Sequence, residues 1–215
     1  MKKELLLKTA FLFFLISFLL NIGNVKAYHI FPEGVPTTTY LVKEDDTLWS
    51  VFQGDWITVA KINRVSPDSL VPGMILLVPI DMEKASGYSP LPHQLPYQTN
   101  ENKVVLVDLE LQVLGKYEKG ELIQWMPISS GKENHLTPKG VFWIYQKELD
   151  HYSNTRPKPE GGAPMPYALR YNGPYWIHQG PLPGHPDSYG CVRLMEMDAA
   201  ILYWWADIKT KVIIE

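Results

Sequence analysis

The chain has 215 residues, of which 46% are hydrophobic and 20% are charged, and this composition is typical of a globular protein rather than a disordered one. The formal net charge of −3 does not favour nucleic acid as a partner. The 18 prolines and 15 glycines favour turns and β structure over long helices.

Residues 1–27 have the pattern of a secretory signal peptide. Three lysines near the start are followed by an apolar run from Thr9 to Leu20, which is shorter than the ~20 residues of a membrane-spanning helix. Small residues before the expected cleavage point after Ala27 complete the pattern. We therefore expect export to the periplasm or cell wall, with no stable membrane span after cleavage. The alternative is an uncleaved membrane anchor.

Residues 38–80 are expected to form a small βααβ module. Thr39 to Lys43 alternate like a strand, and Thr47 can cap a helix that starts at the next residue. A second helix is expected from Trp56 to Asn63, and a second strand from Met74 to Pro79. The order of elements is therefore strand, helix, helix, strand.

This module resembles LysM modules. The resemblance is carried by Asp-Thr-Leu-Trp at 46–49, Ile-Asn at 62–63 and a Pro-Gly turn at 72–73 before the second strand. It implies binding to glycans that contain N-acetylglucosamine, such as the glycan strands of peptidoglycan. The alternative for Trp49 and Trp56 is a purely structural role at the core or its rim.

Residues 81–102 are polar and rich in proline, and they are expected to be a linker. Residues 103–215 are expected to form a mainly β domain. Its predicted strands are 104–107, 111–117, 122–129, 141–145, 175–178 and 212–214. The remaining predictions are turns at 118–121 and 137–140, a loop at 162–167, and a helix from Asp198 to Asp207 with Ile201, Leu202 and Trp205 on one face.

The segment from Ile177 to Leu194 contains the only cysteine of the chain, Cys191. A lone cysteine cannot form an intramolecular disulfide, and with a histidine in the same loop it is a candidate nucleophile. His178 could act as the base. Glycine allows a tight bend, so backbone N–H groups around Gly190 and Cys191 could form an oxyanion hole.

The same segment resembles the active-site motif of the L,D-transpeptidase (YkuD) family. Five residue types of that motif are in place, namely His178, Ser188, Gly190, Cys191 and Arg193. Ser-Ser-Gly at 129–131 and Thr-Pro-Lys-Gly at 137–140 match two further landmarks. Tyr189 replaces the second histidine of the family, and the spacing of 191 − 178 = 13 positions is short. The resemblance implies a YkuD-type β-sandwich with one or two helices.

The resemblance also implies a reaction, which is the cross-linking of peptidoglycan stem peptides without a cofactor. The Cys191 thiolate attacks the carbonyl after the third, meso-diamino residue of a tetrapeptide, D-alanine leaves, and an amine resolves the thioester. His178 moves the protons. Carbapenems acylate the cysteine of this family.

Other residues of the motif receive supporting roles from the resemblance. The backbone N–H groups of Tyr189, Gly190 and Cys191 would form the oxyanion hole. The carbonyl of Gln179 would orient the imidazole. Ser188 is expected to make hydrogen bonds within the loop, and Arg193 either braces the loop or binds a substrate carboxylate.

Three other uses of these residues stay open. His178, His185, Asp187 and Cys191 could bind zinc, although no closely spaced ligand pair is present. The protein could be a hydrolase on the same site, acting as an L,D-carboxypeptidase or an amidase. It could also be a wall-binding protein without catalytic activity.

Overall fold

The computed structural model describes residues 33–153 and 162–215, so the predicted signal segment lies outside the described residues. The helices are α2 (Leu48–Phe52), α3 (Trp56–Asn63), α4 (Met82–Ser86) and α5 (Glu196–Trp205), with 3-10 turns η1 (Gln53–Asp55) and η2 (Pro67–Ser69). Within the described ranges, no helix is both long and apolar enough to cross a membrane.

The strands fall into two sheets. The small sheet consists of β1 (Thr37–Leu41) and β2 (Ile75–Pro79). The large sheet has the order β6-β11-β3-β4-β5-β10-β9-β8-β7. Its strands are β3 (Lys103–Asp108), β4 (Val113–Glu118), β5 (Glu121–Ser129), β6 (Gly140–Trp143), β7 (Gln146–Tyr152), β8 (Pro164–Asn172), β9 (Tyr175–Gln179), β10 (Val192–Leu194) and β11 (Lys211–Ile214).

The N-terminal element, residues 33–80, has the predicted order β1, α2, α3, β2. Thr47 caps α2 in a capping box with Ser50, whose backbone N–H donates to Thr47 Oγ1 over 2.9 Å. Asn63 is buried at the end of α3, and its side chain bonds to both the N–H and the C=O of Leu77 in β2. These bonds satisfy buried polar groups and fix α3 on the small sheet.

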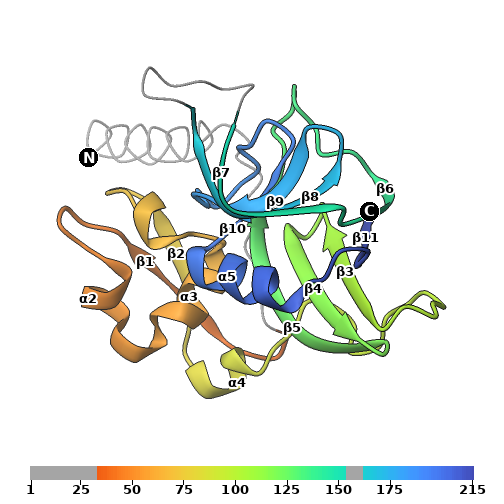
Figure 1. The fold of residues 1–215 in the computed structure, drawn as a ribbon. Coiled ribbons are helices and arrows are strands. Elements are labelled where there is room, and N and C mark those ends of the chain that lie inside the picture. Colours follow the sequence, from red (N-terminus) through yellow and green to blue (C-terminus); the bar gives the residue numbers. More distant parts are fainter. Residues whose placement is uncertain (1–32, 154–161) are drawn as a thin grey trace, which may run out of the picture.

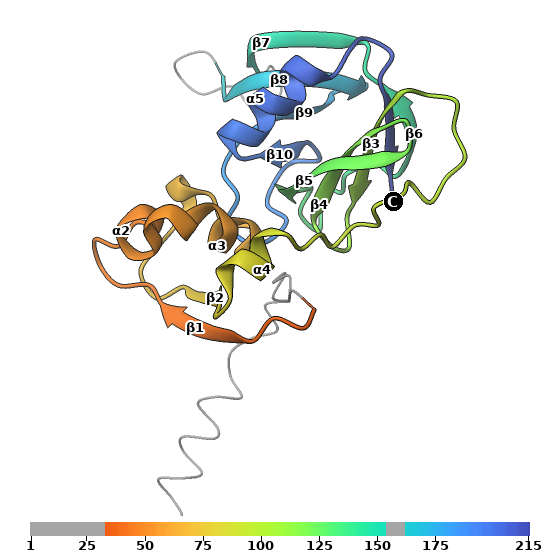
Figure 2. The same ribbon diagram turned by 90° about the horizontal axis from the view of Figure 1, so that it is seen from below.

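The predicted mainly β fold is confirmed for residues 103–215. The large sheet is curled, and side chains from strands on both sides of β5 meet in one hydrophobic core. Helix α5 packs against this core (Figures 1 and 2). The hairpin between β4 and β5 turns through Lys119 and Gly120, which have φ of 50° and 84°. Positive φ at both central residues matches the twist of the strands, so the turn predicted at 118–121 is confirmed.

The segment predicted as a linker, residues 81–102, is packed rather than free. It begins with α4, and Leu91 is buried against the large sheet. The indole N–H of Trp125 donates to the carbonyl of Tyr88, and the hydroxyl of Tyr117 donates to that of Pro92. The segment therefore ties the N-terminal element to the outer face of the sheet.

Two local predictions were wrong. Residues 162–167 were expected to be a loop, but β8 begins at Pro164 and pairs with the unpredicted strand β7. Ile201 was expected on the buried face of the last helix, yet it is 41% exposed. The buried face of α5 consists of Asp198, Ala199, Leu202 and Tyr203.

Candidate active site

Two neighbouring parallel strands, β9 and β10, bring the predicted catalytic residues together. His178 lies near the end of β9 and is aligned with Arg193 in β10. Cys191 directly precedes β10, two positions before Arg193. Because residues two apart on an extended chain point to the same face, Cys191 lies on the side of the sheet that carries His178.

His178 is held in one orientation and one tautomer. Its Nδ1 lies 2.6 Å from the carbonyl oxygen of Gln179. A carbonyl can only accept, so Nδ1 carries the proton and Nε2 is the acceptor nitrogen. Burial, with smaller contributions from the nearby Arg193 and His151 side chains, lowers the pKa of His178 to about 4, although the hydrogen bond to Gln179 opposes this shift. The imidazole is therefore neutral at pH 7.

Cys191 is half-buried beside Trp176, Met165 and Ala168. Burial raises the pKa of the thiol. A hydrogen bond from the backbone N–H of Trp176 and the charge of Arg193 oppose this effect. At neutral pH the site therefore holds a thiol next to a neutral imidazole, an arrangement in which the base must take the proton as the sulfur attacks.

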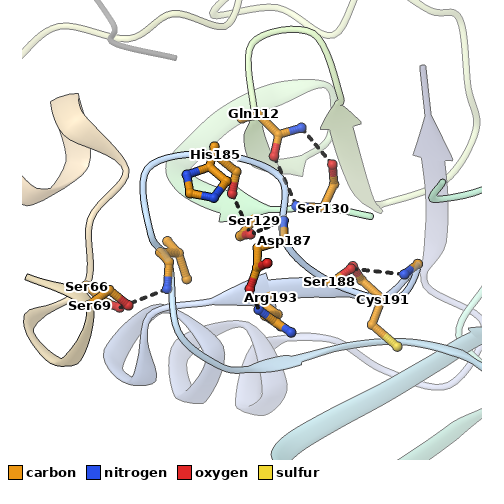
Figure 3. Close-up of polar contacts among 12 residues, drawn as sticks. Ser66, Ser69, Gln112, Ser129, Ser130, His185, Asp187, Ser188, Cys191 and Arg193 are labelled. Atoms are coloured by element: carbon orange, nitrogen blue, oxygen red, sulfur yellow. Dashed lines mark hydrogen bonds and ion pairs between the residues drawn. The ribbon is translucent and has the colours of Figure 1, made fainter. Parts of the chain in front are cut away.

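The loop before Cys191 is held by its own side chains. Ser188 is buried, its hydroxyl donates to the carbonyl of Cys191 over 2.5 Å, and it accepts from the backbone N–H of Gly190 over 3.0 Å (Figure 3). Both bonds of Ser188 join it to residues of the same loop. They also direct the Gly190 N–H toward Ser188, so this amide must turn or share its hydrogen to serve an oxyanion.

Gly190 is required by both conformation and space. Its φ of +104° lies in a region that side chains disfavour, and a Cβ there would come within 2.4 Å of the Tyr175 ring. The tight approach brings the backbone of the loop onto β9.

Arg193 braces the loop. Its guanidinium donates to the carboxylate of Asp187 over 3.0 Å, and its stem covers Gly180, where a Cβ would lie 3.0 Å away (Figure 3). Both contacts are within the loop that Arg193 follows, which favours the bracing role over the alternative of a substrate-carboxylate fork.

Tyr189 points out of the loop toward the segment between β5 and β6. Its ring is 40% exposed, lies 4.2 Å from Lys132 Nζ and makes an edge contact with His135. A cation therefore rests on the residue that replaces the second histidine of the motif.

The four candidate zinc ligands do not gather. Figure 3 shows the His185 ring and the Cys191 sulfur on different sides of Asp187, and the carbonyl of His185 accepts from Ser129 Oγ. Across residues 33–153 and 162–215, no group of three or more His, Cys, Asp or Glu side chains is placed to hold a metal ion. The part of the chain that is described thus gives no zinc site from His178, His185, Asp187 and Cys191.

Sequence reasoning missed two residues of β7 near the site, His151 and Glu148. The indole of Trp176 stacks on His151 at 4.1 Å between ring centroids, and Glu148 lies 2.6 Å from His151 Nδ1. His151 and Glu148 belong to β7, a strand rich in charged residues. A prediction of β7 would have placed a second histidine against Trp176 in β9, close enough to affect the pKa of His178.

Comparisons with known proteins show the family to which the fold belongs. Residues 102–214 match the family model of the YkuD L,D-transpeptidase catalytic domain. An L,D-transpeptidase structure from Stackebrandtia nassauensis is 26% identical, with a TM-score of 0.50, over 55% of this chain and 58% of its own. One from Xylanimonas cellulosilytica is 25% identical, with a TM-score of 0.56, over 74% of this chain and 78% of its own. The chain thus spans less than two thirds of the first of these proteins. No curated protein matches it.

Proposed function

Because the chain belongs to the L,D-transpeptidase family, we propose that it is a cysteine-dependent acyltransferase that cross-links or remodels peptidoglycan. Cys191 is the nucleophile and His178 is the base. The observation that carries this proposal is the fixed tautomer of His178, which presents a neutral Nε2 on the strand beside Cys191.

The acylation step begins with proton transfer from the Cys191 thiol to His178 Nε2. The sulfur then bonds to the carbonyl carbon that follows the meso-diamino residue of the donor stem peptide. The C–N bond to the terminal D-alanine breaks, and His178 returns the proton to the leaving amine. The product is a thioester on Cys191.

The second step transfers the acyl group. The amine of an acceptor attacks the thioester and His178 takes a proton from this amine. The C–S bond then breaks, and His178 passes the proton to the sulfur, which restores the thiol. Backbone N–H groups of Tyr189, Gly190 and Cys191 stabilise the oxyanion in both steps, which requires the Gly190 amide to turn from Ser188 or to share its hydrogen. With water as acceptor the same site would be a carboxypeptidase.

The N-terminal element is proposed to be a LysM module that binds the glycan strands of the same polymer. Its observed βααβ order supports this role, and so does Trp49, whose side chain is 64% exposed on α2. Such an exposed indole can stack on a sugar ring rather than fill a core. A peptidoglycan substrate places the protein in the periplasm or cell wall, as the signal-like residues 1–27 also predict.

The test is incubation of the protein without residues 1–27 with disaccharide-tetrapeptide, followed by mass spectrometry of the products. A cross-linked dimer supports the transpeptidase, and tripeptide alone identifies the hydrolase. The control is Cys191→Ala, which should form neither product while its thermal midpoint stays close to that of the wild type. Turnover by this variant would overturn the assignment of the nucleophile.

A further inference from the structure

The N-terminal element holds one end of the loop that joins His178 to Cys191. This loop, residues 180–191, leaves β9 and returns to β10, and its first half lies against the end of α3 (Figures 2 and 3). The contact involves both a buried side chain and the backbone.

Leu182 inserts its side chain into the N-terminal element. It is fully buried, and it belongs to the same hydrophobic cluster as Leu48, Val59 and Leu76. Met195, just after β10, belongs to this cluster as well. The core of the N-terminal element is thus completed by residues on both sides of the proposed nucleophile.

Ser66 binds both backbone groups of Leu182. The N–H of Ser66 donates to the Leu182 carbonyl over 3.0 Å, and the N–H of Leu182 donates to Ser66 Oγ over 2.9 Å. The next two loop residues continue the pairing, because Pro183 forms a bridge with Val65 and the Gly184 N–H donates to a carbonyl of the N-terminal element over 3.0 Å. Ser66 is 4% exposed, so these bonds are shielded from water.

The second half of the loop is held by the end of β5. Ser129 Oγ donates to the His185 carbonyl over 2.8 Å, and the Asp187 N–H donates to Ser129 Oγ over 3.1 Å (Figure 3). The loop is therefore fixed between two supports, and one of them is the N-terminal element. If Ser66 Oγ is removed, the buried Leu182 N–H loses its acceptor.

We propose that the N-terminal element is a structural part of the active site, and that Ser66 is a positioning residue which sets the place of the loop carrying Tyr189, Gly190 and Cys191. The element would thus serve catalysis on small soluble substrates as well as binding to glycans. This inference rests on the proposed function for the role of Cys191, but its test reads the thiol directly.

The test compares the pH profile of Cys191 alkylation by iodoacetamide in the wild type and in Ser66→Ala. Cys191 is the only cysteine, so the label reports one atom. Burial raises the pKa of this thiol in the wild type. A loosened loop admits water, so we expect the alkylation midpoint to fall by about one pH unit in Ser66→Ala. Alkylation at pH 7 should then rise roughly threefold to tenfold, while acylation by a carbapenem falls at least about tenfold.

Two variants separate positioning from a general loss of stability. Ser50→Ala makes the same substitution in the same element, where it removes the bond from the Thr47 N–H to Ser50 Oγ and leaves the rest of the cap, and it should cost about 1 kcal/mol. Its alkylation profile should match that of the wild type. Ser66→Thr keeps the hydroxyl acceptor and should restore the wild-type profile.

A Ser66→Ala profile that superimposes on the wild type would overturn the inference, and so would an equal shift in Ser50→Ala. The outcome is independent of the proposed function. Failure of that function appears as turnover by Cys191→Ala, whereas the alkylation comparison is decided whatever reaction Cys191 performs.

Discussion

Lys61 Nζ lies 4.1 Å from the centroid of the Trp125 ring, so a cation of α3 rests on an aromatic side chain of β5. Burial lowers the pKa of Lys61, and the negative charge of Asp198 in α5 opposes this shift. Asp198 itself is buried, with one hydrogen bond from Gln124 at 3.3 Å. The N-terminal element and the large sheet are therefore linked by a cation–π contact, and Lys61 and Asp198 also influence each other electrostatically.

We predict that Asp198→Asn stabilises the protein at neutral pH. Burial raises the pKa of Asp198 to about 6, although the charge of Lys61 opposes it. In the unfolded chain the carboxyl ionises near ~3.9, so the folded state loses stability as the pH rises from about 4 through 6. The variant avoids this loss and should gain about 1–3 kcal/mol at pH 7, and nothing below pH 4. Thermal melting of both proteins from pH 4 to 8 measures the difference, and a less stable variant at pH 7 would contradict the shift.

We predict that the acylation rate falls at acidic pH with a midpoint near pH 4. His178 must be neutral to accept the thiol proton, and burial lowers its pKa to about 4. The rate of acylation by a carbapenem should therefore stay nearly constant between pH 5 and 7. With an ordinary histidine as the base, the rate would fall in this range as the imidazole became protonated. His178→Ala should lose ~10²–10⁴-fold in this rate. The measurement is the pseudo-first-order rate from pH 4 to 9, and a midpoint near the ordinary histidine pKa would argue against this environment.

We predict a small effect of Tyr189→His. The ring at this position lies outside the loop and under Lys132 Nζ, whose charge disfavours an imidazolium there. The new histidine should stay neutral at pH 7, and acylation by a carbapenem should change by less than tenfold, or ~1.4 kcal/mol. If the variant reacts a hundredfold faster than the wild type, the protein is a weakened member of its family and the wall-binding alternative gains support.

We predict that Gly190→Ala disrupts the site. The alanine Cβ would lie 2.4 Å from the Tyr175 ring at a φ of +104°, so the loop must shift. The expected cost is about 1–3 kcal/mol in stability together with a large loss of acylation. Gly54→Ala is the matched control, because its Cβ would meet no atom within 4 Å. Acylation at the wild-type rate by Gly190→Ala would show that the loop backbone does not form the oxyanion site.

We predict that Trp49→Ala releases the protein from purified sacculi. The indole is 64% exposed and offers a face to a sugar ring. The experiment uses the Cys191→Ala background, so that no covalent link contributes to retention, and compares bound with free protein. Ser50→Ala, at the next position, is the control. Equal retention of the Trp49 variant would remove this residue from the glycan site.

Local patterns in the sequence predicted most of the fold. The strand-forming runs that correspond to β3, β4 and β5, the turn at Lys119 and Gly120, and the cap at Thr47 are all short-range features, and each is present. The strand β7 was missed because its sequence, QKELDHY, is polar and charged and lacks an apolar alternation. Its place at the edge of the sheet explains this composition, since edge strands tolerate exposed charge.

The candidate site was predicted as a list of residues, and the contacts among them were not. His178 and Cys191 follow from the lone cysteine and the motif around it. The stacking of His151 on Trp176 depends on the pairing of β7 with β8 and of β8 with β9. The insertion of Leu182 into another part of the chain likewise depends on tertiary packing, which no local pattern encodes.

Leu182 and Met195 belong to the large-sheet part of the chain in sequence but pack in the core of the N-terminal element, so the two parts share one core. A fragment that stops at Ile80 lacks both side chains, and a catalytic fragment alone exposes them to water, which favours aggregation. Recombination that replaced the N-terminal element with another glycan-binding module would also have to supply a pocket for Leu182 and an acceptor for its amide. During evolution, substitutions on one side of this contact should therefore be matched by substitutions on the other side, and exchange of the whole N-terminal element should be rare.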